Sequence, residues 1–171
     1  MKKPLIYFLI ALLCLTFFNC KENQNNMQPE ELRQTGVVVM QSIDVTVRNK
    51  LGEDLLNPAN EYRIKEFKIY YLVNGAKKLY YNANMDASSG YRLLKHPSKG
   101  NYYLNILMNG SMGVLKSTTF LQLGNAATLD TISTQYRADP NNIVPEKIWF
   151  NGRLAWKIED GEPPVYEIIR E

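Results

Sequence analysis

Short runs of alternating apolar and polar residues, separated by turn residues, dominate the chain from residue 37 onward. This period-two alternation is typical of β-strands that bury one face. Two runs are interrupted by Asn74-Gly75 and Asn151-Gly152. Asn-Gly favours the type I′ turn of a β-hairpin, because both central positions of that turn need a positive φ. The predicted strands span residues 37–48, 64–73, 77–81, 91–94, 102–108, 117–123, 128–136, 147–150, 153–159 and 165–170.

No segment after residue 37 shows the sustained 3.6-residue periodicity of an amphipathic helix. Nine or ten short strands at this spacing are typical of an all-β domain made of two packed sheets. The sequence therefore predicts a single antiparallel β-sandwich over residues 37–171.

The first twenty residues have the sequence pattern of an export signal. Lys2 and Lys3 precede an apolar stretch at 5–18, and Cys20 follows directly. As a helix this stretch would be roughly 21 Å long, against about 30 Å of bilayer hydrocarbon, so it suits a signal peptide better than a membrane span. A cysteine at the cleavage point is typical of a bacterial lipoprotein. An ordinary secretory leader is disfavoured, since no small-residue cleavage site lies near the end of the apolar stretch.

The predicted organisation is a signal peptide at 1–19, a lipidated Cys20 with a flexible tether at 20–36, and the β domain at 37–171. Asn, Gln and Glu fill the tether, which cannot bury enough apolar surface to offset its ordering entropy. Its root-mean-square reach would be roughly 20 Å. Lys21 after Cys20 does not match the inner-membrane retention signal of enterobacteria. We therefore expect an outer-membrane protein, with the periplasmic or cell-surface side left open.

Composition excludes several classes of function. Removing Lys2 and Lys3 lowers Lys+Arg from 20 to 18 against 17 acidic residues, which leaves a charge of +1 and no basic footprint for nucleic acid. The other cysteine, Cys14, lies in the predicted leader, so the mature chain would have no internal disulfide.

The sequence carries no signature of catalysis. The single histidine, His96, lies between turn residues and lacks partners for a triad, and no glycine-rich phosphate loop is present. One histidine and no free cysteine disfavour zinc. The acidic pairs Glu53-Asp54 and Glu159-Asp160 occur at turns, where such residues are common for local reasons. We therefore expect no enzyme activity, no cofactor and no metal site.

Paired aromatic residues are the one sequence feature that suggests a binding surface. Adjacent strand residues point to opposite faces, so each Tyr-Tyr pair should supply one inward ring for the core and one outward ring. Outward rings could form a platform for a sugar or a protein, although cross-strand aromatics also simply stiffen a sheet. The candidate ligand-binding aromatics are Tyr70, Tyr71, Tyr80, Tyr81, Tyr102, Tyr103, Trp149 and Trp156.

Two stretches carry a family resemblance. Residues 130–132 followed by 147–152, and the opening stretch 44–58, resemble small uncharacterised lipoproteins of the Bacteroidetes type. The opening stretch is also similar to the first strand and turn of transthyretin-like sandwiches, which implies an accessory module with an immunoglobulin-like or transthyretin-like fold. Asp130-Thr131-Ile132 resembles the O-glycosylation acceptor of Bacteroidetes, which makes Thr131 a candidate. Its place inside a predicted strand favours an ordinary strand residue instead.

These observations favour a non-catalytic interaction module of the cell envelope, held to the membrane by its lipid anchor. The partner would be an envelope protein. The alternative is a glycan-binding surface lipoprotein that uses its exposed Tyr and Trp rings, since the apolar faces of sugars stack on aromatic rings.

Overall fold

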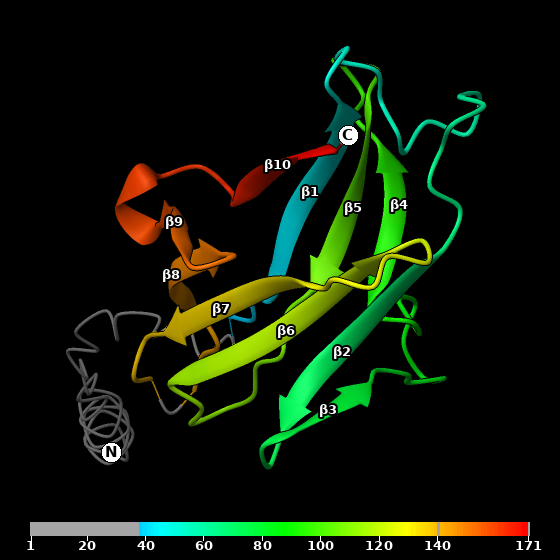
Figure 1. Cartoon of the computed structure of the whole chain (residues 1–171). Coiled ribbons are helices and arrows are strands. Elements are labelled where there is room, and N and C mark those ends of the chain that lie inside the picture. Colours follow the sequence, from blue (N-terminus) through cyan, green and yellow to red (C-terminus); the bar gives the residue numbers. More distant parts are fainter. Residues whose placement is uncertain (1–37, 140, 171) are drawn as a thin grey trace, which may run out of the picture. The chain divides into compact units, whose positions relative to one another are not determined.

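The computed structural model describes residues 38–139 and 141–170. The predicted signal peptide at 1–19, Cys20 and the predicted tether at 20–36 lie outside the described residues. Regular structure in the described part consists of strands and one short 3-10 helix, η1 (Ile158–Asp160). The strands are β1 (Ser42–Asn49), β2 (Phe67–Val73), β3 (Ala76–Leu79), β4 (Tyr91–Lys95), β5 (Tyr102–Leu107), β6 (Lys116–Leu123), β7 (Asp130–Tyr136), β8 (Pro145–Phe150), β9 (Arg153–Lys157) and β10 (Val165–Arg170) (Figure 1).

The strands form two sheets. A four-stranded sheet has the order β10-β1-β5-β4, and a six-stranded sheet has the order β3-β2-β6-β7-β8-β9 (Figure 1). Each observed strand overlaps one predicted strand. The all-β prediction is therefore confirmed for the described residues.

The prediction of a wholly antiparallel domain is wrong at one strand pair. β1 and β10 run parallel, with Val45 opposite Tyr166 and Val47 opposite Ile168. The chain leaves β9 in the six-stranded sheet, passes through η1, and enters the four-stranded sheet beside β1. A hairpin imposes antiparallel pairing on consecutive strands, but this connection changes sheet and leaves the direction free.

Several strand ends also differ from the prediction; β2, for example, begins at Phe67 and not at residue 64. β1 begins at Ser42, and only an isolated parallel bridge between Val39 and Ile143 precedes it. β3 ends at Leu79, although the Tyr80 N–H still donates to the Ile69 carbonyl at 2.8 Å. β9 ends at Lys157, where the chain tightens into η1 instead of continuing as a strand.

One hydrophobic cluster draws on both sheets. Alternate residues of β1 (Ile43, Val45 and Val47) are buried, as period-two alternation predicts. The six-stranded sheet contributes side chains such as Ile132 to the same cluster. Burying each large aliphatic side chain contributes about 1.5–3 kcal/mol.

Aromatic side chains connect the two sheets. The rings of Phe150 on β8 and Tyr166 on β10 stack with centroids 3.9 Å apart. The Tyr71 hydroxyl on β2 donates to the Leu107 carbonyl of β5 at 3.0 Å. These contacts fix one sheet against the other at the level of single residues.

Both Asn-Gly turns have the predicted conformation. Asn74 and Gly75 have φ of 52° and 75°, and Asn151 and Gly152 have φ of 49° and 78°. These values match the positive φ that a type I′ turn requires at both positions. The second turn is reinforced, because the Asn151 Oδ1 accepts the Thr131 N–H at 2.8 Å.

Candidate binding groove

Four of the eight candidate aromatic residues belong to the interior. Tyr71, Tyr80 and Tyr102 pack against the hydrophobic cluster, and Trp156 is a buried member of it. The Tyr71 and Tyr80 ring centroids lie 4.6 Å apart. Burial, and next the neighbouring Tyr80, raise the pKa of the Tyr71 hydroxyl above its ordinary value. These rings stabilise the fold and are not available as a platform.

The other four rings point outward but do not share one surface. Tyr70 and Trp149 lie on the outer face of the six-stranded sheet, because their neighbours in sequence point inward. Tyr103 lies on the outer face of the four-stranded sheet, with its ring centroid 6.4 Å from that of His96. Tyr81 follows β3 and is 71% exposed. The described residues therefore contain no platform that unites these four rings.

Of the four outward rings, Tyr70 has the most contacts with neighbouring side chains. It lies opposite Phe120 of β6, and the Lys77 Nζ lies 5.6 Å from the Tyr70 ring centroid and 5.7 Å from that of Phe120. The Tyr70 hydroxyl donates to the Gln122 Oε1 at 2.9 Å. An ammonium over two rings is a cation–π arrangement that holds the sheet surface together and already occupies the ring faces.

The contacts of Thr131 and His96 serve the fold. Thr131 is half-buried on β7 between the buried side chains of Asp130 and Ile132. The His96 Nδ1 accepts the N–H groups of Ser98 and Lys99 at 3.3 and 3.1 Å, which holds the turn after β4. Cys20 lies outside the described residues.

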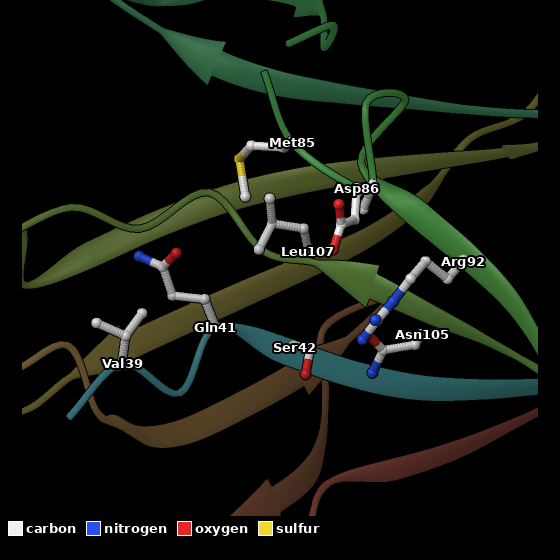
Figure 2. A pocket seen from close by; sticks show the side chains of 9 residues that line it. Val39, Gln41, Ser42, Met85, Asp86, Arg92, Asn105 and Leu107 are labelled. Carbon is white, nitrogen blue, oxygen red and sulfur yellow. The ribbon is translucent and has the colours of Figure 1, made fainter. Parts of the chain in front are cut away.

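A groove opens where β1 begins and where the loop before β4 passes over the four-stranded sheet. Its volume is about 330 Å³. A hollow of about 190 Å³ adjoins it along β1 and shares four of its lining residues. Both apolar and polar side chains line the groove: Val39, Gln41, Ser42, Met85, Asp86, Ala87, Arg92, Asn105 and Leu107 (Figure 2).

A row of polar side chains crosses three neighbouring strands at the floor of the groove. Arg92 of β4 lies opposite Asn105 of β5, which lies opposite Asp44 of β1. The Arg92 Nη2 donates to the Asn105 Oδ1 at 3.3 Å, and the Asn105 Nδ2 donates to the Asp44 Oδ1 at 2.7 Å. These bonds orient the Arg92 guanidinium and leave most of its N–H donors free of bonds to other described residues (Figure 2).

The loop at 82–90 brings Met85 and Asp86 to the groove. The Asn82 N–H donates to the Ser88 carbonyl at 2.8 Å, which closes the loop. Gly90 ends it with a φ of +81°, and a Cβ there would lie 2.9 Å from the Tyr80 ring. Only glycine fits this position. Figure 2 shows Met85 and Asp86 among the side chains that line the groove.

Another wall of the groove is held by contacts from Gln41, just before β1, to the chain that follows β5. The Gln41 Nε2 donates to the Gly110 carbonyl at 2.7 Å, and the Met108 N–H donates to the Gln41 carbonyl at 2.6 Å. A Cβ on Gly110 would lie 2.6 Å from the Tyr136 hydroxyl oxygen, so the loop can approach this closely only with glycine.

The groove offers binding chemistry. Arg92 supplies directed N–H donors, Asp86 supplies carboxylate acceptors, and Met85 and Leu107 supply apolar contacts. Within residues 38–139 and 141–170, no three His, Cys, Asp or Glu side chains gather as a metal would require. Sequence reasoning missed Asp44, Arg92 and Asn105. Alternation assigns each of them to an outward face, but their alignment depends on the strand register.

Comparisons with known proteins gave no match. No protein-family profile matches it, and no curated protein or solved structure is significantly similar. Among the described residues, no helix is long and apolar enough to cross a membrane. What the chain does must therefore be inferred from its own residues.

Proposed function

We propose that this chain is a lipid-anchored protein of the cell envelope and acts there as a non-catalytic interaction module. Its two sheets would form a β-sandwich of the immunoglobulin-like or transthyretin-like kind. The shared hydrophobic cluster supports this arrangement, because side chains of both sheets fill one core. The leader pattern and Cys20 support the anchor, and we place the protein at the outer membrane.

The groove floor is the observation that carries the interaction module. Arg92, Asn105 and Asp44 form an ordered row of hydrogen-bonding groups, and the apolar side chains of Met85 and Leu107 lie beside it. Oriented polar groups beside apolar contacts are typical of a recognition site. We assign the groove to a segment of an envelope protein that presents a carboxylate or backbone carbonyls to Arg92.

A pull-down from detergent-solubilised envelope tests this assignment. The full-length, anchored protein should capture a partner in stoichiometric amount, and Arg92→Glu should reduce capture at least tenfold. The control is Arg153→Glu, an exposed charge reversal on β9, which should leave capture unchanged. Equal capture by wild type and Arg92→Glu would exclude the groove as the partner site.

A glycan array measured in parallel tests the alternative. Saturable binding to a glycan that is lost in Tyr70→Ala or Trp149→Ala, and retained in Arg92→Glu, would replace the protein-binding module with a glycan-binding one. These two rings are the candidate aromatics on the outer face of the six-stranded sheet, and neither lines the groove.

Mass spectrometry of the mature N-terminus tests the anchor. We expect an acylated Cys20, and Cys20→Ala should yield an unprocessed or soluble protein. An unmodified N-terminus at another position would overturn the lipoprotein assignment.

A further inference from the structure

Exposed apolar side chains gather at one end of the fold, which we call the entry end. It comprises residues 38–41, the β2–β3 turn at 73–76, the loop at 108–115 and a fourth segment, whose described residues are 137–139 and 141–144. Large apolar side chains that are 36–53% exposed occur on three of these four segments. They are Val38, Val39, Met40, Val73, Met112 and Leu115.

Hydrogen bonds show that these segments lie together. The Gln41 side chain binds the Gly110 carbonyl at 2.7 Å, and the Met40 N–H donates to the Ile143 carbonyl at 2.8 Å. The Asn109 Nδ2 donates to the Leu72 carbonyl at 3.1 Å, which places the loop at 108–115 beside the end of β2. Figure 1 shows the same neighbourhood, with β2 ending and β6 beginning at the same end of the six-stranded sheet.

Internal hydrogen bonds satisfy part of the backbone of the entry end. The Val38 N–H donates to the Asn142 Oδ1 at 2.7 Å, the Ile143 N–H donates to the Val38 carbonyl at 2.9 Å, and the Tyr136 N–H donates to the Leu115 carbonyl at 2.8 Å. Loops whose polar groups are already paired lose little when they leave water. Lys116 and Arg137 are exposed cations next to these loops.

The short distance in sequence from Cys20 indicates which surface the entry end contacts. Val38 is the first described residue, and only residues 21–37 separate it from Cys20. A tether of that length reaches roughly 20 Å, so an acyl chain on Cys20 would keep the domain within contact distance of the bilayer. The apolar residues belong to separate loops with Met among them, which suits a fluid lipid surface better than the flat complementary face of a protein.

We propose that the entry end docks on the lipid surface that holds the anchor, with Met112 and Leu115 at headgroup level and Lys116 and Arg137 against anionic phosphates. This inference rests on the proposed lipid anchor at Cys20. Apolar insertion adds to an acyl anchor in the way that a second membrane signal does. Val39 also lines the groove, whereas Met112 and Leu115 do not, so those two residues separate docking from partner binding.

A single-cysteine experiment tests the docking. If Cys20 is acylated and Cys14 is removed with the leader, a cysteine introduced by Met112→Cys is the only free thiol of the full mature chain. The protein carrying an environment-sensitive dye there is placed in vesicles of phosphatidylethanolamine and phosphatidylglycerol with brominated acyl chains. The matched control is Leu51→Cys, at an 85% exposed position in the turn after β1, beyond the opposite end of that strand.

Docking predicts that bromine quenches the dye at position 112 at least about twofold more strongly than at position 51. Leu115→Asp should remove the difference while the protein still floats with the vesicles. Equal quenching at both positions in floating protein overturns the docking. Self-quenching of the dye at position 112 in detergent, without lipid, would assign the patch to a second copy of the chain and also overturn it. A protein that does not float and takes up dye at Cys20 instead overturns the anchor, and with it the docking.

Discussion

Asp130 and Arg170 form an ion pair that joins the two sheets. Asp130 is a buried residue of β7 in the six-stranded sheet, and Arg170 belongs to β10 in the four-stranded sheet. The second carboxylate oxygen of Asp130 accepts the Asn151 Nδ2 at 2.9 Å. The Asp130 carboxylate therefore has two partners, Arg170 on β10 and Asn151 in the β8–β9 hairpin.

Removal of the Arg170 cation should destabilise the fold. Arg170→Gln leaves the Asp130 carboxylate buried without its counter-charge, and breaking a buried pair in this way costs several kcal/mol. Since the Arg170 side chain is 33% exposed, we expect about 1–3 kcal/mol by urea unfolding. Arg153→Gln on the exposed edge of β9 is the control and should change stability by less than about 0.5 kcal/mol. Equal effects in the two variants would show that the pair adds nothing.

The two tryptophans should differ sharply in their contribution to stability. Trp156 is 7% exposed and its Nε1–H donates to the Glu162 carbonyl at 2.7 Å, whereas Trp149 faces outward on β8. Trp156→Ala should cost about 3–5 kcal/mol, and Trp149→Ala about 1 kcal/mol. Unfolding is followed by circular dichroism, because each substitution removes a fluorophore. A larger loss in Trp149→Ala would mean that the placement of the β8–β9 hairpin is wrong.

The two Asn-Gly hairpins provide a matched test of side-chain bonding. Asn74→Ala and Asn151→Ala both place alanine at a positive φ, which costs about 1–2 kcal/mol. Asn151→Ala additionally removes the bonds to the Thr131 N–H and to Asp130. Asn151→Ala should therefore be more destabilising by about 1 kcal/mol in chemical denaturation. Equal losses would indicate that turn conformation alone matters.

Stability should fall in alkaline solution because of buried tyrosines. Burial raises the pKa of Tyr71, and it also raises that of Tyr136, whereas tyrosines in the unfolded chain ionise near pH 10. Above pH of about 10 the unfolded state binds fewer protons than the folded state, so the free energy of unfolding decreases as pH rises. Below that pH this contribution is fully present.

Urea unfolding across this alkaline range should show a shallower decline in Tyr71→Phe. That variant also loses the bond to the Leu107 carbonyl and starts from a stability lower by about 1 kcal/mol. Tyr62→Phe, at a 75% exposed position, should keep the wild-type slope. A slope unchanged by Tyr71→Phe would contradict the assignment.

Local sequence patterns predicted the strands well, because the alternation of apolar and polar residues depends only on the residues of a single strand. The alternation of Ile43, Val45 and Val47 reflects burial of one strand face. Pairing between distant strands leaves no such trace. The parallel partner of β1 could not be read from either strand, since both alternate in the same way. A register shift between Ile148 and Trp149 likewise puts Trp156 opposite Ile148, facing the core.

The groove was harder to predict for the same reason. Asn105 meets partners that lie 13 and 61 positions away in the chain, Arg92 and Asp44. Each is an ordinary polar residue of an outward strand face, and only the register across three strands puts them in one row. The aromatic pairs are conspicuous in the sequence, but half of their rings serve the interior.

The parallel pairing of β1 with β10 has a consequence for the order in which the protein acquires its structure. Asp44 and Val165, which lie opposite each other, are 165 − 44 = 121 positions apart. During N-to-C synthesis, β1 emerges before the other described strands, and its outer hydrogen-bonding edge stays open until β10 has been made. Such long-range closure slows folding, and an open strand edge invites pairing with other chains. The interval between the appearance of β1 and that of β10 is therefore the time at which the incomplete chain is most exposed to aggregation.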